Sequence, residues 1–175
     1  MKSREEILEQ FSKLLDVMDD LRSKCPWDRE QTMETIRSLT IEETYELSDA
    51  IIQNDLTEVK KELGDILLHI VFYSKIASET ATFDIGDVIE SLIAKLIRRH
   101  PHVFTDLVVS SNEELEANWA KIKSEEKHRE SVTDGVPIAM PALQLATQLI
   151  YRARNSDVPA SDSSLKNSLR QIIGD

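Results

Sequence analysis

Apolar residues recur at intervals of three and four along most of this chain, which is the spacing of one face of an α-helix. The first run spans residues 4–21, and Ser3 with Glu6 three positions later forms a capping box at its start. Pro26 interrupts the pattern, because the residue before a proline avoids the helical conformation. Five further helices are predicted, from Thr40 to Gln53, from Asp55 to Ser78, after Asp84, after Ser111, and from Pro141 to Arg154.

Period-two alternation, the signature of a strand, is not convincing in any segment of the sequence. Thr40 with Glu43 matches a second capping box, which places the start of the second helix. We therefore expect an all-α fold, an antiparallel helical bundle with short connections. The third and fourth helices are apolar over a wide arc, so we also expect a homodimer that covers this surface.

The composition narrows the class of protein. The chain has 175 residues, a length that suits one domain, and a formal net charge of -11. No basic surplus exists to neutralise phosphates, which argues against nucleic acid as a partner. One cysteine, an N-terminus without an apolar signal region and no run of membrane-spanning length favour a soluble cytoplasmic protein without a membrane partner.

Acidic residues on the second and third predicted helices show a matched spacing. The pairs Glu46 with Glu62 and Glu43 with Asp65 are both centred on Asn54, in the polar turn between the helices. If the helices fold back about this turn, the partners lie level, and residues three apart share a helix face. Four carboxylates would then converge, an arrangement that requires a cation. Oxygen ligands suit Mg²⁺, with Mn²⁺ as an alternative.

Two other readings of these acids remain open. Most helical carboxylates are simply solvated. A ferritin-type di-iron site needs Glu-x-x-His on two helices, and the sequence offers this spacing only at Glu125 and His128, in a polar segment.

A second polar group, at the end of the fourth helix, is basic and can either complement the helix dipole or hold phosphates. Its cations are Lys95, Arg98 and Arg99.

Several motifs in order resemble the MazG family of nucleoside triphosphate pyrophosphohydrolases, over about residues 5–154. The acidic signature, with Glu42 and Glu43 at its start and Asp65 at its end, matches the family's own. Further matches are the segments 25–32, 62–68, 95–104, 118–123 and 134–137. Met33 and His69 depart from the family pattern, which has His and Gln at these positions.

The resemblance implies an enzyme, a metal-dependent hydrolase that converts a nucleoside triphosphate to a monophosphate and pyrophosphate on a dimeric helical scaffold. By position, four residues would ligate the metal, namely Glu43, Glu46, Glu62 and Asp65. Glu42 would orient or deprotonate the attacking water. The substrate would be contacted by Trp27, Lys95, Arg98 and Arg99.

The domain expected from this resemblance covers residues 1–130. Residues 131–175 resemble the start of a connection to a second domain, whose acidic signature this sequence does not contain. The alternative function is therefore a non-catalytic module that binds a nucleotide or a metal and acts through a partner.

Overall fold

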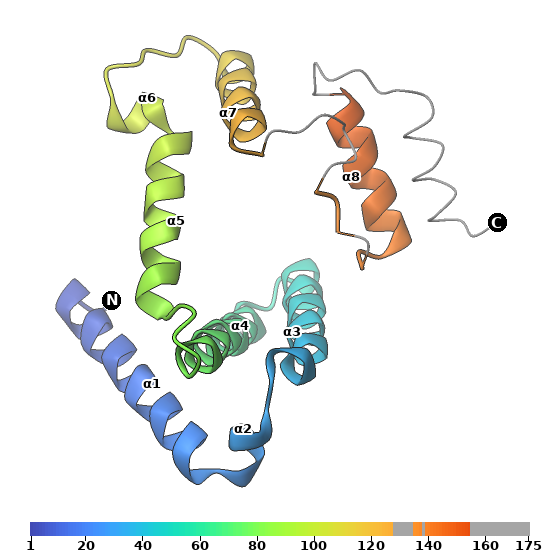
Figure 1. The fold of residues 1–175 in the computed structure, drawn as a ribbon. Coiled ribbons are helices and arrows are strands. Elements are labelled where there is room, and N and C mark those ends of the chain that lie inside the picture. The colour runs from blue at the N-terminus through green and yellow to red at the C-terminus, as the bar shows by residue number, and fades with distance from the viewer. Residues whose placement is uncertain (128–134, 138, 155–175) are drawn as a thin grey trace. The chain divides into compact units, whose positions relative to one another are not determined.

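A computed structural model describes residues 1–127, 135–137 and 139–154 of the chain. The described residues form helices and turns with no strand among them, which confirms the all-α class (Figure 1). The chain folds as two compact units, Met1–Ile93 and Ala94–Asp175. The predicted domain boundary near residue 130 falls outside the described residues.

The first unit contains four complete helices and the start of a fifth. They are α1 (Arg4–Lys24), α2 (Pro26–Glu30), α3 (Met33–Gln53), α4 (Leu56–Ser78) and α5 (Ile85–Arg99). The capping box predicted for α1 is confirmed, since the backbone N–H groups of Ser3 and Glu6 each donate to the other residue's side chain. Pro26 interrupts the helical run as predicted, but it also begins the one-turn helix α2, which the pattern did not indicate.

The predicted start of α3 at Thr40 is wrong. The helix begins one residue after Thr32, whose side chain and that of Thr35 form the capping box instead. Thr40 lies inside the helix, where its hydroxyl donates to the carbonyl of Ile36 at 3.2 Å and contacts the Tyr73 hydroxyl at 2.7 Å. Thr32 was missed because a capping box usually carries Glu or Gln at its third helical position, and here a threonine hydroxyl serves.

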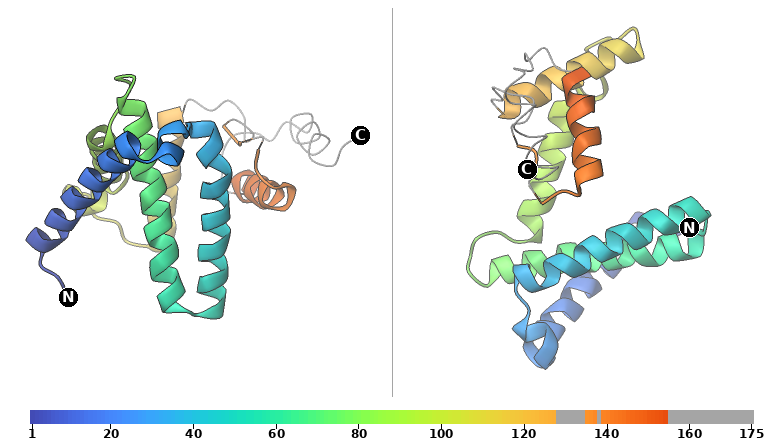
Figure 2. Two further views of the ribbon diagram at one scale, coloured as in Figure 1. Left: turned by 90° about the horizontal axis from the view of Figure 1, so that it is seen from below. Right: turned by 90° about the vertical axis from the view of Figure 1, so that its right-hand side faces the viewer.

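The hairpin of α3 and α4 was predicted correctly. Figure 2 shows the two helices side by side and running in opposite directions. Asn54 adopts the left-handed conformation at φ 57°, which asparagine tolerates better than most residues. The Asn54 and Asp55 N–H groups donate to the carbonyls of Ile51 and Ala50, so the last carbonyls of α3 are satisfied. Asp55 then caps α4 by accepting from the N–H groups of Thr57 and Glu58.

The core of the first unit lies where α1, α3 and α4 meet. Its buried centre consists of Met18, Ile36, Val71 and Phe72. Other apolar residues of α4 are exposed, among them Leu63, Leu67 and Ile70, which recur at helical spacing. This exposed stripe is part of the apolar surface on which the predicted dimer depends.

The second unit contains the end of α5, the one-turn helix α6 (Pro101–Phe104), α7 (Asn112–Lys127) and α8 (Ala142–Arg154). Starts predicted after Ser111 and at Pro141 agree with α7 and α8 to within a residue. None of the described helices combines the length and the apolarity that crossing a bilayer requires.

Candidate metal centre

The α3–α4 hairpin brings three of the predicted ligands together. Carboxylate oxygens of Glu43, Glu62 and Asp65 lie within 4.8 Å of one another. Glu43 is on α3, and the other two are three residues apart on α4, so they share one face of that helix. Among the described residues, Glu42 and Glu46 lie outside this group of three, and both add negative charge around Glu43.

Glu62 is the most buried member of this acidic cluster, with 8% of its surface exposed. Its Oε2 atom is buried and has no hydrogen-bond partner among the described residues. A buried carboxylate oxygen without a partner is costly, because it loses hydration and gains nothing in return. A cation ligated by Glu62 would satisfy this atom, so the donor set fits a divalent ion that prefers oxygen.

The electrostatics of the cluster favour binding of a positive charge. Burial raises the pKa of Glu43, and the charges of Asp65, Glu46 and Glu42 raise it further. Burial also raises the pKa of Glu62, and its interactions with Glu43, Asp65 and Glu58 raise it further. A divalent cation would offset the mutual repulsion of these carboxylates.

These pKa shifts predict that the free energy of unfolding of the metal-free protein depends on pH. An acid whose pKa is higher in the folded state than in the unfolded state binds more protons when folded, so the free energy of unfolding decreases as the pH rises. The decrease begins near the ordinary glutamate pKa of 4.5 and is complete above the raised pKa values of Glu43 and Glu62. Below a pH of 4.5 the two carboxyl groups are protonated in both the folded and the unfolded state, so the two states no longer differ in the number of bound protons.

Denaturant unfolding in EDTA from pH 4 to pH 8 measures this effect, with Glu62→Gln as the reference. We expect the variant to gain stability relative to the wild type as the pH rises, because the amide does not ionise. A stability difference that is constant across this range would contradict the assignment of raised pKa values to the cluster.

His69 lies one turn beyond Asp65 on α4 and is buried. Burial lowers the pKa of its imidazole, and the charge of Asp65 acts in the opposite direction. The ring is therefore neutral at pH 7.

Gly64 offers no sign of close packing, because a Cβ atom at this position would meet no other atom within 4 Å.

The predicted substrate contacts lie on other elements. Trp27 is in α2 and is 55% exposed. Lys95, Arg98 and Arg99 are in the part of α5 that belongs to the second unit. There the guanidinium groups of both arginines bind the Glu126 carboxylate, with the Arg98 Nε donating at 2.7 Å.

Glu126 was not identified from the sequence. The hydrogen bonds from Arg99 and Arg98 outweigh desolvation and lower its pKa to about 2, so the carboxylate is charged at neutral pH. Arg99 also lies over the ring of Trp119, with 5.9 Å between the guanidinium carbon and the ring centroid. No spacing rule connects two arginines to an acid on another helix, so this contact required the structure.

The fold and the site together define a helical domain with a carboxylate cluster suited to a divalent cation. Residues 31–104 match the family model of the MazG nucleotide pyrophosphohydrolase domain. A nucleoside triphosphate pyrophosphohydrolase of Escherichia coli K12 is 42% identical over 154 residues, which cover 85% of this chain and 59% of that protein. The chain belongs to the MazG family.

Two further relatives extend this comparison. An uncharacterised 26.1 kDa protein of Streptomyces cacaoi is 46% identical over 148 residues, covering 83% of this chain and 61% of that protein. The crystal structure of a MazG-related protein from Thermotoga maritima superimposes with a TM-score of 0.57 at 27% identity, covering 65% of this chain and 98% of that one. The chain thus spans about three fifths of the length of the first two curated relatives.

Proposed function

We propose that this chain hydrolyses nucleoside triphosphates to a nucleoside monophosphate and pyrophosphate with the help of a divalent cation. The observation that carries the proposal is the convergence of three carboxylates around a buried Glu62 oxygen that lacks a partner. Relatives named nucleoside triphosphate pyrophosphohydrolase support the choice of reaction.

Glu43, Glu62 and Asp65 would hold the cation, and Glu46 would complete the ligand set from the next turn of α3. Mg²⁺ is the cation we propose, and Mn²⁺ is the alternative, because both prefer oxygen ligands. Such an ion, when bound, would neutralise negative charge on the triphosphate and on the pyrophosphate leaving group.

Glu42 is exposed and adjacent to a ligand, which suits a general base. We propose that its carboxylate orients a water molecule and accepts a proton from it. The water oxygen forms a bond to the α-phosphorus as the bond from that phosphorus to the bridging oxygen breaks. Both electrons of the broken bond leave with pyrophosphate.

The remaining proposed roles concern binding. The exposed ring of Trp27 would contact the nucleoside, and Lys95, Arg98 and Arg99 would contact phosphates. Arg98 and Arg99 would do so while they also bind Glu126. We further propose a catalytic domain over residues 1–130 followed by a separate segment 131–175, and a cytoplasmic location.

The exposed stripe of α4 supports a homodimer. Leu63, Leu67 and Ile70 present large apolar side chains on neighbouring turns of one helix. A second copy of the same stripe is self-complementary, which is the simplest way to cover an apolar surface of this kind.

Release of pyrophosphate tests the proposed reaction. We expect the purified protein to produce pyrophosphate and monophosphate in equal amounts from at least one ribo- or deoxynucleoside triphosphate when Mg²⁺ is present. EDTA should abolish the release, and Mg²⁺ added in excess should restore it. Binding of triphosphates by a folded protein that releases no pyrophosphate would instead support the non-catalytic regulatory module.

A further inference from the structure

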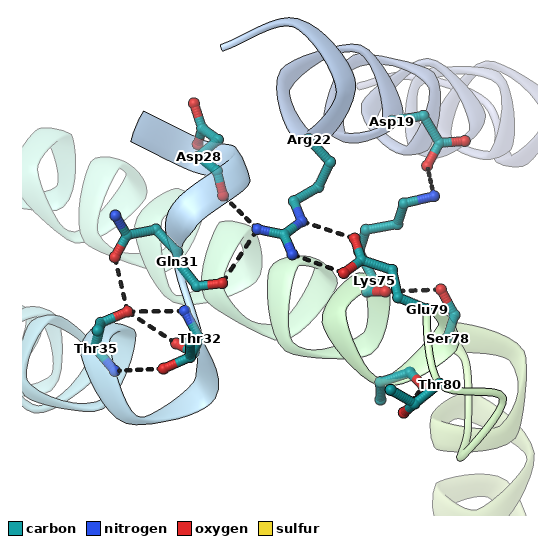
Figure 3. Close-up of polar contacts among 11 residues, drawn as sticks. Asp19, Arg22, Asp28, Gln31, Thr32, Thr35, Lys75, Ser78, Glu79 and Thr80 are labelled. Carbon is teal, nitrogen blue, oxygen red and sulfur yellow. Dashed lines mark hydrogen bonds and ion pairs between the residues drawn. The ribbon is translucent and has the colours of Figure 1, made fainter. Parts of the chain in front are cut away.

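Arg22, in the last turn of α1, connects three elements of the first unit through one guanidinium group (Figure 3). Its Nε and Nη2 atoms donate to the two carboxylate oxygens of Glu79 at 2.7 and 2.6 Å. Its Nη1 atom donates to the backbone carbonyl of Asp28 and, at 3.1 Å, to that of Gln31. The guanidinium also lies 5.7 Å from the centroid of the Phe72 ring.

A charged side chain that is 10% exposed needs partners for its donors, and here each of the three guanidinium nitrogens donates at least one hydrogen bond. The hydrogen bond with Arg22 lowers the pKa of Glu79, so the pair is ionised at neutral pH. Glu79 stands at the end of α4, and the two carbonyls belong to the end of α2. We call these contacts the Arg22 clamp.

Helix α2 has a particular need for such contacts. It is five residues long, too short to be stable alone in water, and an isolated turn satisfies few of its own carbonyls. The Asp28 carbonyl accepts from the Gln31 N–H at 3.2 Å and also from Arg22. Arg22 binds the carbonyl of Gln31 as well, and the Gln31 side chain donates to the Trp27 carbonyl at 3.0 Å. The Gln31 Oε1 atom in turn accepts from the Thr35 hydroxyl at 2.7 Å, at the start of α3.

The clamp therefore fixes α2 against α4, and Gln31 ties it to α3. These are the two helices that carry the acidic cluster. The side chain that α2 displays is Trp27, a large apolar ring with more than half of its surface exposed. Burial of the Trp27 ring does not explain why these contacts hold α2, because more than half of the Trp27 surface is exposed.

We propose that Arg22 is a positioning residue, which holds the Trp27 ring in a fixed place relative to the acidic cluster so that a nucleoside meets a preformed surface. A surface that is already ordered binds a ligand more tightly than a mobile one, because no side-chain freedom is lost on binding. The inference rests on the proposed function for the ligand, whereas the fixing of Trp27 itself can be measured without any substrate.

Arg22→Lys is the decisive variant. Lysine keeps the positive charge, but its single ammonium group does not reproduce the planar fork that reaches one carboxylate and two carbonyls. Lys75→Gln is the matched control, because Lys75 forms an ion pair with Asp19 at 2.6 Å that also joins α4 to α1 but does not contact α2 (Figure 3). Each variant changes one ion pair between α1 and α4.

The first measurement is fluorescence of Trp27 in the free protein. Trp119→Phe leaves Trp27 as the only tryptophan, since the sequence contains two. In this background we expect Arg22→Lys to lower the anisotropy of Trp27 and raise its quenching by acrylamide, and Lys75→Gln to change neither. Unchanged anisotropy and quenching in Arg22→Lys would overturn the proposal, whether or not the protein hydrolyses triphosphates.

The second measurement is steady-state pyrophosphate release with Trp119 retained. We expect Arg22→Lys to raise KM by about tenfold with a much smaller change in kcat, as for loss of a binding surface rather than a reacting group. Lys75→Gln should keep the KM of the wild type. A loosened Trp27 with unchanged KM would overturn the substrate role of the clamp, while the proposed reaction would stand. Absence of release from the wild type would refute the proposed function, and the fluorescence would still decide whether the clamp fixes Trp27.

Discussion

Replacing Glu62 with glutamine is expected to lower cation-dependent pyrophosphate release by about 100- to 1,000-fold, the scale seen when a group that stabilises transition-state charge is removed. The amide has nearly the shape of the carboxyl group but carries no charge. Its N–H group can donate to a neighbouring carboxylate, as a protonated carboxyl group can. The fold should therefore survive while the cation loses its most buried ligand.

The same substitution should leave the metal-free protein at least as stable as the wild type. In the wild type, burial raises the pKa values of Glu43 and Glu62, and repulsion among the neighbouring negative charges raises them further. Removing one charge relieves this repulsion. Activity and metal-free stability should thus change in opposite directions, a result that general damage to the fold would not produce.

Binding of the cation supplies a third readout. A ligand present at 100 times its dissociation constant stabilises the folded state by about 2.7 kcal/mol. Thermal unfolding with and without Mg²⁺ should reveal such stabilisation for the wild type and little of it for Glu62→Gln. Glu9→Gln is the matched control, because Glu9 is an exposed carboxylate on α1, paired with Lys13 at 2.9 Å. Normal release and normal Mg²⁺ stabilisation in Glu62→Gln would refute the assignment.

The hairpin that builds this cluster was predictable because its information is local. Helical spacing, a polar turn and a pair of acids on each side of Asn54 are enough to define the register of two antiparallel helices. The spacing placed Glu46 level with Glu62, whereas the structure groups Glu62 and Asp65 with Glu43. Spacing gives the level of a residue along a helix, but the length and rotamer of each side chain decide which oxygens meet.

The contacts made by Arg22 and Glu126 were not predictable for a related reason. Arg22 and Glu79 are 57 residues apart, and no periodic pattern connects them. Two of the acceptors for Arg22 are backbone carbonyls, which every residue possesses, so side-chain identity gives no signal of them. Only the packing of α1 against α4 shows why an arginine stands at this position.

Leu67→Asp is expected to convert the proposed homodimer to a monomer. Leu63, Leu67 and Ile70 form an apolar stripe on α4, each with at least 39% of its surface exposed. Burying a leucine side chain contributes about 1.5–3 kcal/mol relative to leaving it in water. In an interface with twofold symmetry the substitution occurs twice, so two leucine contacts are lost and two charges enter an apolar surface.

An aspartate placed there would be desolvated without a partner, which opposes association far more strongly than the loss of the leucine alone. Light scattering coupled to size exclusion at micromolar concentration should give a dimer for the wild type and a monomer for Leu67→Asp. Ser12→Asp adds the same charge to an exposed polar position of α1 and should remain a dimer. The exposed position of Leu67 implies little cost to the fold of one protomer, so the helical circular dichroism of the monomer should persist. A monomeric wild type would show that this stripe does not mediate self-association.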